Sequence, residues 1–194
     1  MIKIIDDIIP TDIQDALEKK ILQPNFPWGR MTSSDLSNQA SSDYTLRKRK
    51  DFLNDNIIDP SQFYHDIVMG QQLGKYFEWF TPIIDSIKFD GIQILRMKMN
   101  FNFPFVGASE DSHGIPHVDL PEEDGYTTGV YYVTNGDGDT ILFNEKRGHI
   151  GKLTIQKKVS PKKGRIVLFD GNTLHAACPP ISNRPRIVIN INIR

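Results

Sequence analysis

The sequence predicts a mainly β protein: a jelly-roll core of the double-stranded β-helix type, covered by N-terminal helices. Helical signals dominate before about residue 90, whereas apolar and polar residues alternate with period two after it, as in half-buried strands. The expected strands are short and separated by turn-forming residues, as in β-sandwiches and barrels. We therefore expect one domain over 1–194, with a helical N-terminal layer over 1–90 and the jelly-roll core over 91–194.

The first expected helix begins near residue 11. Thr11 and Gln14 have the spacing of a capping box, in which two side chains satisfy backbone groups at a helix start. Ile13, Leu17 and Ile21 then follow at the spacing of one helical face. This pattern predicts an amphipathic helix that packs on the core.

A second helix is expected to start at Asp59 as the N-cap, with Pro60 in its first turn and Gln62 at the third position. Its apolar stripe is expected to run through Phe63, Ile67, Leu73, Phe77 and Phe80. The stretch 31–43 between the two helices is rich in Ser, Asn and Asp, so we expect a loop there.

The longest expected strand covers 92–103. Its two faces are Arg96, Lys98, Asn100 and Asn102 on one side, and Leu95, Met97, Met99 and Phe101 on the other. The polar face either lines a pocket or faces water. Further strands are expected at 127–134, 139–143, 152–159, 165–169 and 186–193. The Asn-Gly-Asp-Gly sequence at 135–138 is typical of a turn between two of them.

Composition restricts the function classes. The net charge of −1 gives no global field that would attract nucleic acid or an anionic membrane. The one cysteine, Cys178, has no internal partner for a disulfide, as is usual in a reducing compartment. Acidic residues interrupt the apolar N-terminal run, and no stretch is long and apolar enough to span a bilayer. We expect a cytoplasmic protein without a membrane partner.

His117 and Asp119 are the first candidates for chemistry. On a strand, side chains two residues apart share a face, so an imidazole and a carboxylate at this spacing can converge on one ion. With a third ligand from elsewhere they would form the facial triad of non-haem Fe(II) oxygenases. The pattern alone is weak in a chain with five histidines, and a surface histidine beside a turn aspartate would look the same.

A downstream segment supplies the missing groups. Residues 164–171 read as a buried strand ending in a turn, and His175 follows directly. Arg186 then opens the strand that carries Ile187-Val188-Ile189. A histidine and an arginine at these strand ends can both face a barrel interior, where one would bind a metal and the other a carboxylate through a two-pronged charged hydrogen bond.

Residues 94–193 resemble the prolyl-4-hydroxylase-like branch of the Fe(II)- and 2-oxoglutarate-dependent oxygenases, in particular its small phage and bacterial members. The matching pieces are R-M-K-M-N at 96–100, H-V-D-L-P at 117–121, G-V-Y-Y-V-T-N at 129–135, G-R-I-V-L-F-D at 164–170, H-A-A-C-P-P at 175–180 and R-I-V-I-N-I-N at 186–192. They occur in the family's order over about half of the chain. The first 90 residues resemble the family only through their start, I-I-D-D-I-I-P.

The resemblance assigns roles to five residues. It implies that His117, Asp119 and His175 are the iron ligands, that Arg186 binds the distal carboxylate of 2-oxoglutarate, and that Tyr132 gives its hydroxyl to the same carboxylate.

Some family members place the arginine two positions closer to the histidine, where this chain has Arg184. Arg186 is preferred because it directly abuts the strand, whereas Pro185 indicates a loop before it. Strand alternation would point Val188 and Asn190 inward together with Arg186.

The implied activity is oxidative decarboxylation of 2-oxoglutarate coupled to hydroxylation of a substrate C–H bond. It requires Fe(II), 2-oxoglutarate and O2, with ascorbate in a supporting role. Family members that halogenate carry a small residue at the position of Asp119, so the aspartate favours hydroxylation. The nucleic-acid demethylases have two arginines six residues apart, unlike Arg184 and Arg186 here, so a nucleic acid is not the expected partner.

The expected substrate is a peptidyl proline, another amino-acid side chain or a small molecule. Substrate recognition is expected in the loop 104–116 and in 31–43, although both read equally well as exposed connectors. The rival class is a non-catalytic metal-binding domain of the cupin type, which would not need Arg186 or Tyr132. His65, His113 and His149, and the basic run 47–50, are expected to be ordinary polar residues.

Overall fold

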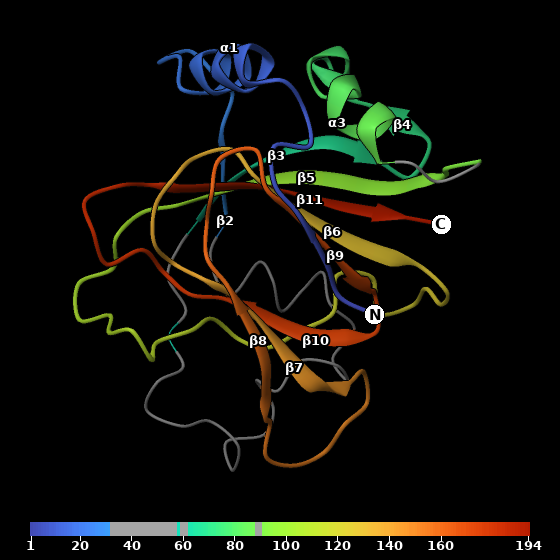
Figure 1. Ribbon diagram of the computed structural model, residues 1–194, viewed down its shortest axis with the longest axis vertical. Coiled ribbons are helices and arrows are strands. Elements are labelled where there is room, and N and C mark those ends of the chain that lie inside the picture. The colour runs from blue at the N-terminus through green and yellow to red at the C-terminus, as the bar shows by residue number, and fades with distance from the viewer. Residues whose placement is uncertain (32–57, 59–61, 88–90) are drawn as a thin grey trace.

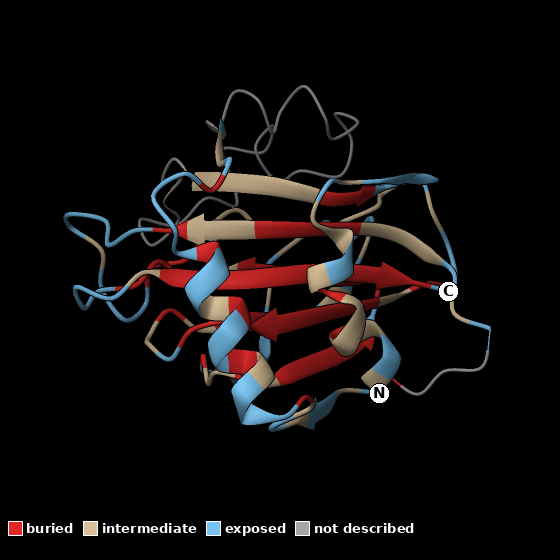
Figure 2. Ribbon diagram, turned by 90° about the horizontal axis from the view of Figure 1, so that it is seen from above, coloured by how far each residue is buried: buried red, intermediate tan, exposed pale blue. Residues whose placement is uncertain are grey.

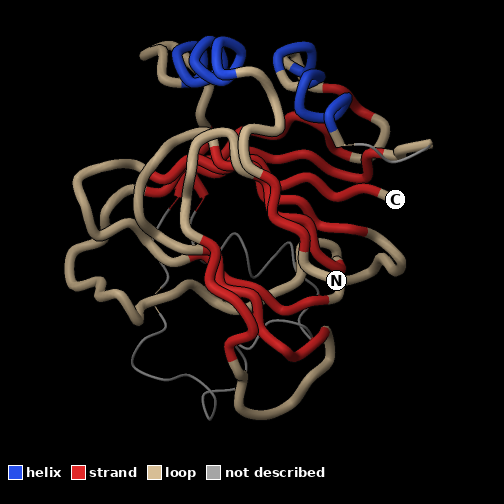
Figure 3. Tube along the Cα trace, viewed as in Figure 1, coloured by secondary structure: helices blue, strands red, loops and turns tan. Residues whose placement is uncertain are grey.

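The computed structural model describes residues 1–31, 58, 62–87 and 91–194. They form two antiparallel sheets with short helices above the larger one (Figures 1 and 3). The major sheet has the order β1-β9-β6-β11-β5-β3-β2, with β4 paired to β3, and the minor sheet has the order β10-β7-β8. The major-sheet strands are β1 Lys3–Ile5, β2 Gly29–Met31, β3 Gln62–Met69, β4 Gln72–Leu73, β5 Ile94–Asn102, β6 Thr127–Tyr132, β9 Ile166–Asp170 and β11 Arg186–Ile193. Those of the minor sheet are β7 Thr140–Lys146, β8 Ile155–Val159 and β10 Thr173–Ala177.

Helices α1 (Thr11–Ile21) and α3 (Thr81–Ser86) and the 3-10 turn η3 (Phe77–Trp79) lie across the outer face of the major sheet (Figures 1 and 2). The largest apolar cluster lies between these helices and the sheet, and it includes Leu17, Ile83, Met97 and Ile189. A second apolar cluster, which contains Tyr132, Leu142, Phe169 and Val188, lies between the two sheets. Among the described residues, no helix is long and apolar enough to cross a membrane.

The central strands alternate as the sequence predicts. β5 and β11 pair in antiparallel register from Arg186↔Asn102 to Asn192↔Arg96. Met97, Met99, Ile187 and Ile189 belong to the cluster under the helices. The polar residues of β5 and the even-numbered residues of β11 therefore share the opposite face, toward the minor sheet. This places Arg186, Val188 and Asn190 on the inner face, as expected.

The expected second helix is wrong. Residues 62–69 form β3, which pairs with β5 over Phe63↔Phe101 to Met69↔Arg96. Only the end of the stretch is helical, in η3 and α3. The long ladder with β5 outweighs the local helix-start signal, whose Asp59 and Pro60 lie outside the described residues. The region before residue 90 is therefore only partly helical, because it also contributes β1 to β4 to the major sheet.

The first helix is confirmed, but its predicted capping box is wrong. The N-cap residue is Pro10 and no side chain caps the helix. Gln14 is buried, and its Nε2 donates to the carbonyl of Ile9 at 2.8 Å. An added Cβ at Gly164 would lie 2.4 Å from Gln14 Nε2, so the glycine allows α1 to pack against the β8–β9 turn. The segment 32–57, which contains most of the predicted polar loop and the basic run, lies outside the described residues.

Candidate active site

His117 and His175 face each other across a backbone bridge. The amide of each donates to the carbonyl of the other, with N···O distances of 2.9 and 3.0 Å. The two rings have centroids 4.7 Å apart. His175 belongs to β10, a strand that the sequence analysis missed, whereas His117 adds a single antiparallel bridge at the edge of the minor sheet. The expectation that 117–119 form a strand is wrong, since only residue 117 is bridged.

Backbone carbonyls orient both imidazoles. Nδ1 of His117 lies 2.8 Å from the carbonyl of Ile115, and Nδ1 of His175 lies 3.1 Å from that of Thr173. A carbonyl only accepts, so each Nδ1 carries the proton and a neutral ring keeps its lone pair on Nε2. Burial, with a smaller contribution from His117, lowers the pKa of His175 to about 4, so this ring is neutral near pH 7.

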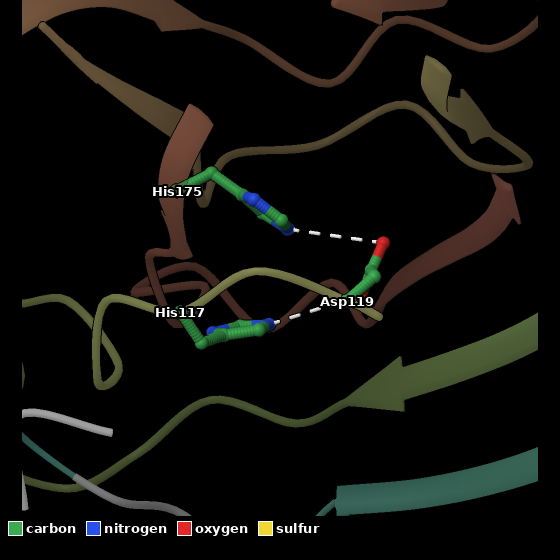
Figure 4. Close-up of side chains that lie close together, drawn as sticks. All are labelled: His117, Asp119 and His175. Atoms are coloured by element: carbon green, nitrogen blue, oxygen red, sulfur yellow. Dashed lines mark ion pairs between the residues drawn. The ribbon is translucent and has the colours of Figure 1, made fainter. Parts of the chain in front are cut away.

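Asp119 completes the cluster from the segment after His117 (Figure 4). Its Oδ1 lies 4.0 Å from His117 Nε2, and its Oδ2 lies 4.0 Å from His175 Nε2. One ligand atom from each of the three residues lies within 4.8 Å of the others. The Asp119 side chain is 2% exposed and that of His117 is 42% exposed, so the cluster is open to solvent on the His117 side.

The surroundings of Asp119 favour its charged form. Burial alone would raise the pKa of this carboxyl group. The nearby His175, Arg96 and His117, and a hydrogen bond from Asn192, outweigh that effect and hold the pKa well below its ordinary value. Asp119 is therefore an anion that two imidazole nitrogens face.

These three groups fit a divalent first-row metal. The buried Nε2 of His175 has no hydrogen-bond partner among the described residues. A buried polar atom without a partner is costly, and such atoms are rare unless a ligand or ion meets them. Two imidazoles and one carboxylate on one side of an ion form the facial set typical of non-haem Fe(II), which leaves open positions for other ligands.

Arg186 is a buried cation on the inner face of β11 and is 3% exposed. Its Nε donates to the carbonyl of Gly138 at 2.7 Å, its Nη2 to Thr140 Oγ1 at 2.8 Å, and its Nη1 lies 3.5 Å from Asn102 Oδ1. Burial lowers its pKa, but an arginine remains charged in proteins. Its printed partners are neutral oxygen atoms and no acidic side chain of the described residues forms an ion pair with it, so its positive charge is available to an anionic ligand.

Tyr132 lies beside this arginine, with the Arg186 guanidinium carbon 5.8 Å from the centre of its ring. Its hydroxyl hydrogen-bonds to Thr140 Oγ1 at 2.7 Å and to the carbonyl of Val159 at 3.1 Å. Burial raises the pKa of Tyr132, so the hydroxyl is protonated at neutral pH. The structure thus brings Tyr132 and Arg186 together, but the hydroxyl is engaged by the protein. Its predicted contact with 2-oxoglutarate stays a prediction.

The two candidate arginines differ in their environment. Arg184 is exposed and lies in the loop before β11, whereas Arg186 is buried and on the inner face. Arg184 lines a shallow surface depression together with Asp137 and Ser182. The side chain of Asp137 accepts bonds from the Ser182 amide and hydroxyl at 2.8 and 2.9 Å, so the predicted turn closes against this loop.

The polar face of β5 lines the interior and does not face bulk water. Arg96 contacts Asp119, Lys98 is 5% exposed with its Nζ 4.7 Å from the centre of the Tyr64 ring, and Asn102 lies near Arg186. Burial, with a smaller effect of the Arg96 charge, lowers the pKa of Lys98 to about 8. This face thus connects the two candidate sites, the three-residue cluster and the buried arginine.

Three further residues were not singled out from the sequence. Thr140 bonds both Arg186 and Tyr132, Asn192 donates to Asp119, and Tyr126 bonds the amide that follows Asp119. The alternation along β11 was a usable signal for Asn192, because Asn192 shares the face of Arg186. No signal in the sequence indicated Thr140 or Tyr126.

The remaining candidates lie outside the cluster. His113 is buried with its Nδ1 2.7 Å from the carbonyl of Gly114, and His65 lies among the aromatic side chains next to Phe26. His149 is an exposed loop residue. Cys178 is an unpaired, buried thiol that packs with Val118 and Ile141.

Residues 105–194 match the family model of the 2OG-Fe(II) oxygenase superfamily. No curated protein gives a significant match. Solved structures similar to this one include a Pseudomonas putida prolyl-4-hydroxylase (15% identity, 100% of this chain and 91% of that chain, TM-score 0.52). They also include a Trichoplax adhaerens prolyl hydroxylase in complex with a hypoxia-inducible factor peptide (16%, 99% and 82%, 0.58). A third is the epimerase SnoN from nogalamycin biosynthesis with Fe3+ and α-ketoglutarate (9%, 99% and 78%, 0.62).

Fold and site define a double-stranded β-helix with a two-histidine, one-carboxylate cluster, the arrangement of non-haem iron enzymes. The matched segment contains all three of these side chains as well as Arg186. By this match, residues 105–194, a little under half of the chain, are those of a 2OG-Fe(II) oxygenase, an enzyme with Fe(II) as cofactor and 2-oxoglutarate as cosubstrate.

Proposed function

We propose that this enzyme hydroxylates an amino-acid side chain, a peptidyl proline being the first candidate, with His117, Asp119 and His175 as its metal ligands. The observation that carries the ligand assignment is the convergence of the partnerless Nε2 of His175 with His117 Nε2 and a buried, charged carboxylate. Fe(II) bound there would supply the activation of O2 that oxidises both 2-oxoglutarate and the substrate.

The chain's own groups prepare this chemistry. The Nδ1 protons of both histidines are held by backbone carbonyls, so each ring presents its Nε2 lone pair in one fixed direction. Asp119 contributes one negative charge and stays ionised near neutral pH. Because a carboxylate fills this third position, no space is left there for a halide, and hydroxylation is favoured over halogenation.

We assign Arg186 to the distal carboxylate of 2-oxoglutarate. A buried guanidinium without an acidic partner among the described residues is a strong site for a carboxylate, which it can bind through two parallel hydrogen bonds. Thr140 bonds to Nη2 of Arg186 and to the Tyr132 hydroxyl, so it can hold these two groups in a fixed mutual orientation. The Tyr132 hydroxyl joins the carboxylate if it exchanges its present partners for it.

The proposed substrate-binding elements are the loop 104–116 and the stretch 31–43, of which 32–43 lies outside the described residues. The loop leads directly into His117, whose side chain is the exposed one of the three ligands. The amide of Ile58 donates to the carbonyl of His113 at 3.0 Å, so residue 58 contacts this loop. Phe105 and Val106 expose apolar surface at the loop. A peptide is favoured by analogy with the peptide-bound prolyl hydroxylase, which shares the fold at 16% identity.

We further propose that the 194 residues act as one domain in the cytoplasm. Both halves of the chain contribute strands to the major sheet, and the cysteine is unpaired. A nucleic-acid substrate is not part of the proposal, because the net charge is −1.

Succinate release tests the function. Purified protein is supplied with Fe(II), ascorbate, 2-oxoglutarate and O2, and succinate is quantified with and without a panel of peptides, amino acids and nucleotides screened for the gain of one oxygen. Substrate-dependent succinate with a matching mass gain is expected for a peptide. Metal binding without any succinate release would instead indicate the non-catalytic cupin-like class.

Arg186→Ala and Arg184→Ala form a matched pair for the cosubstrate assignment. Loss of two charged hydrogen bonds, about 3 kcal/mol, raises the KM for 2-oxoglutarate about 100-fold or more in Arg186→Ala. The metal affinity of Arg186→Ala should stay unchanged, and Arg184→Ala should resemble the wild type. Arg186→Lys should have an intermediate KM, because it keeps the positive charge but cannot form two parallel hydrogen bonds to a carboxylate. A larger effect of Arg184→Ala would overturn the assignment.

A further inference from the structure

Asp119 lies in a segment without regular structure, so backbone pairing does not fix its carboxylate. A neighbouring strand supplies the contact instead. Asn192, on the inner face of β11 and 0% exposed, donates from Nδ2 to Asp119 Oδ2 at 3.0 Å and to Thr128 Oγ1 at 3.1 Å. Both acceptors face the same nitrogen, and the reverse orientation of the amide would place its oxygen against a carboxylate. The donor orientation is therefore determined by the environment.

Arg96 holds the same residue from the next strand. Its Nη1 donates to the backbone carbonyl of Asp119 at 2.9 Å and lies 3.9 Å from Asp119 Oδ1. Arg96 and Asn192 are direct partners in the β5–β11 register, and Asn192 is in turn opposite Thr128 on β6. One row across three strands thus carries Arg96, Asn192 and Thr128, and Asp119 lies against this row.

We propose that Arg96 and Asn192 are positioning residues for the metal site, a role that rests on the proposed function. Asn192 fixes the rotation of the Asp119 carboxylate about its terminal bond, and Arg96 fixes the backbone from which the carboxylate projects. Together they turn an aspartate on an irregular segment into a preorganised ligand that faces the two Nε2 atoms. Outer contacts of this kind typically change metal affinity by about 10- to 100-fold when removed.

The alternative is a purely structural role, in which Asn192 and Arg96 only tie the irregular segment to the sheet. Both roles predict a loss of stability on substitution, so stability alone does not separate them. A positioning role predicts, in addition, weaker binding of the metal to protein that is still folded.

Asn192→Ala and Asn190→Ala are the matched variants. Asn190 is on the same strand and inner face, one row away, and pairs with Lys98 and Val130, whereas Asn192 bonds Asp119. Co(II) alone is titrated into each protein, following its visible absorption and the rise in the unfolding midpoint that metal binding produces. Asn192→Ala should bind Co(II) at least about 10-fold more weakly than the wild type, whereas Asn190→Ala should retain the wild-type affinity.

Arg96 provides a second test if Asn192→Ala does not fold. Arg96→Met should weaken Co(II) binding, Arg96→Lys should recover part of the affinity because it keeps a charged donor, and Arg194→Met serves as control. Arg194 touches the same segment only through an exposed contact with Glu123 at 3.4 Å. Folded Asn192 and Arg96 variants with wild-type Co(II) affinity would overturn the positioning role. Absence of Co(II) binding by the wild type would instead overturn the proposed metal site itself.

Discussion

The three side chains that converge in the candidate active site are held in two different ways. His117 and His175 are joined by two backbone hydrogen bonds, and their rings are oriented by carbonyls two residues away. Asp119, only two residues after His117, has no strand pairing and is held by side chains of Arg96 and Asn192. Backbone hydrogen bonds therefore fix the positions of the two histidines, whereas side chains distant in sequence fix the position of the aspartate.

The difference has a consequence for robustness. Backbone bonds do not depend on residue type, so many substitutions near the histidines should leave their geometry intact. The position of Asp119 depends on particular side chains, and so does the segment that follows it. Leu120 donates to the hydroxyl of Tyr126, while Arg147 donates to the carbonyls of Pro121 and Glu123. Substitutions at such tethers should affect metal binding more than substitutions around the histidines.

Replacing a histidine ligand should have the largest effect. His175→Leu introduces an apolar side chain of similar size and removes a buried nitrogen that has no partner among the described residues. Metal affinity should fall by more than about 100-fold, beyond the usual cost of an outer contact. The unfolding free energy of the metal-free protein should change by no more than about 1 kcal/mol, because the lost Thr173 bond is offset by removal of the unpartnered atom.

Metal titration and denaturant unfolding of the same His175→Leu sample check this expectation. Val118→Ala, next to the ligands in sequence but packed in the apolar cluster with Ile141, is the control. It should lose stability through a cavity while keeping most of its metal affinity. A His175→Leu protein that unfolds without metal would show that the histidine is structural.

Gly171→Ala should have the next largest effect, because it would push against Tyr126, which holds the segment after Asp119. A Cβ at residue 171 would lie 2.2 Å from Cε2 of Tyr126, a buried ring that the β9–β10 turn encloses. Overpacking of this kind costs about 1–3 kcal/mol of unfolding free energy. Because Tyr126 also holds Leu120, metal affinity should fall as well. Unchanged stability, measured by urea denaturation against Gly136→Ala, whose added Cβ would meet its nearest atom only at 4.0 Å, would contradict the packing argument.

The site shows which parts of this structure can be predicted from sequence. β5 and β11 follow strict alternation, so their inward faces were predictable, including that of Arg186. The predicted bounds hold for β11, whereas β5 is shorter than the predicted 92–103. The convergence of His117, Asp119 and His175 was also predicted, although for a partly wrong reason. The prediction placed 117–119 on a strand, whereas a single bridge and side-chain tethers hold these residues.

What was missed depends on contacts distant in sequence. Asn192 lies 73 residues from Asp119, and Thr140 lies 46 residues from Arg186, so neither pairing has a local signal. β3 was mistaken for a helix because the Asp-Pro sequence before it resembles a helix cap. Its pairing with β5 shows that it is a strand. β10 is five residues long and lies between a turn and two prolines, too short for its period to be read.

Tyr126→Phe should have a smaller effect than Gly171→Ala, because it removes a hydroxyl without adding volume. The hydroxyl accepts from the Leu120 amide at 3.1 Å and donates to the carbonyl of Gly171 at 2.9 Å. Loss of these bonds should lower the unfolding free energy by about 1–2 kcal/mol. Tyr131→Phe, in the apolar cluster under the helices, is the control for loss of a buried hydroxyl.

Metal binding separates the two tyrosine variants. Tyr126→Phe should weaken Co(II) binding by a few-fold, since the segment after Asp119 gains freedom, whereas Tyr131→Phe should not. Equal metal affinities in the two variants would mean that the hydrogen bond between Tyr126 and Leu120 does not help to position Asp119.

Arg194→Ala should have the smallest effect, and it delimits the tethered segment. Arg194 and Glu123 are both about half exposed, with 3.4 Å between Nη1 and Oε2, and exposed ion pairs contribute about 0–1 kcal/mol. Arg147 also reaches Glu123, but it does so through the backbone carbonyl and is shielded from solvent. We therefore expect Arg194→Ala to leave stability and metal affinity within error of the wild type at 0.15 M salt, and Arg147→Ala to lower both. A loss of metal affinity in Arg194→Ala would mean that an exposed ion pair also helps to position Asp119. Buried side-chain contacts would then not be the only contacts among the described residues that hold this ligand.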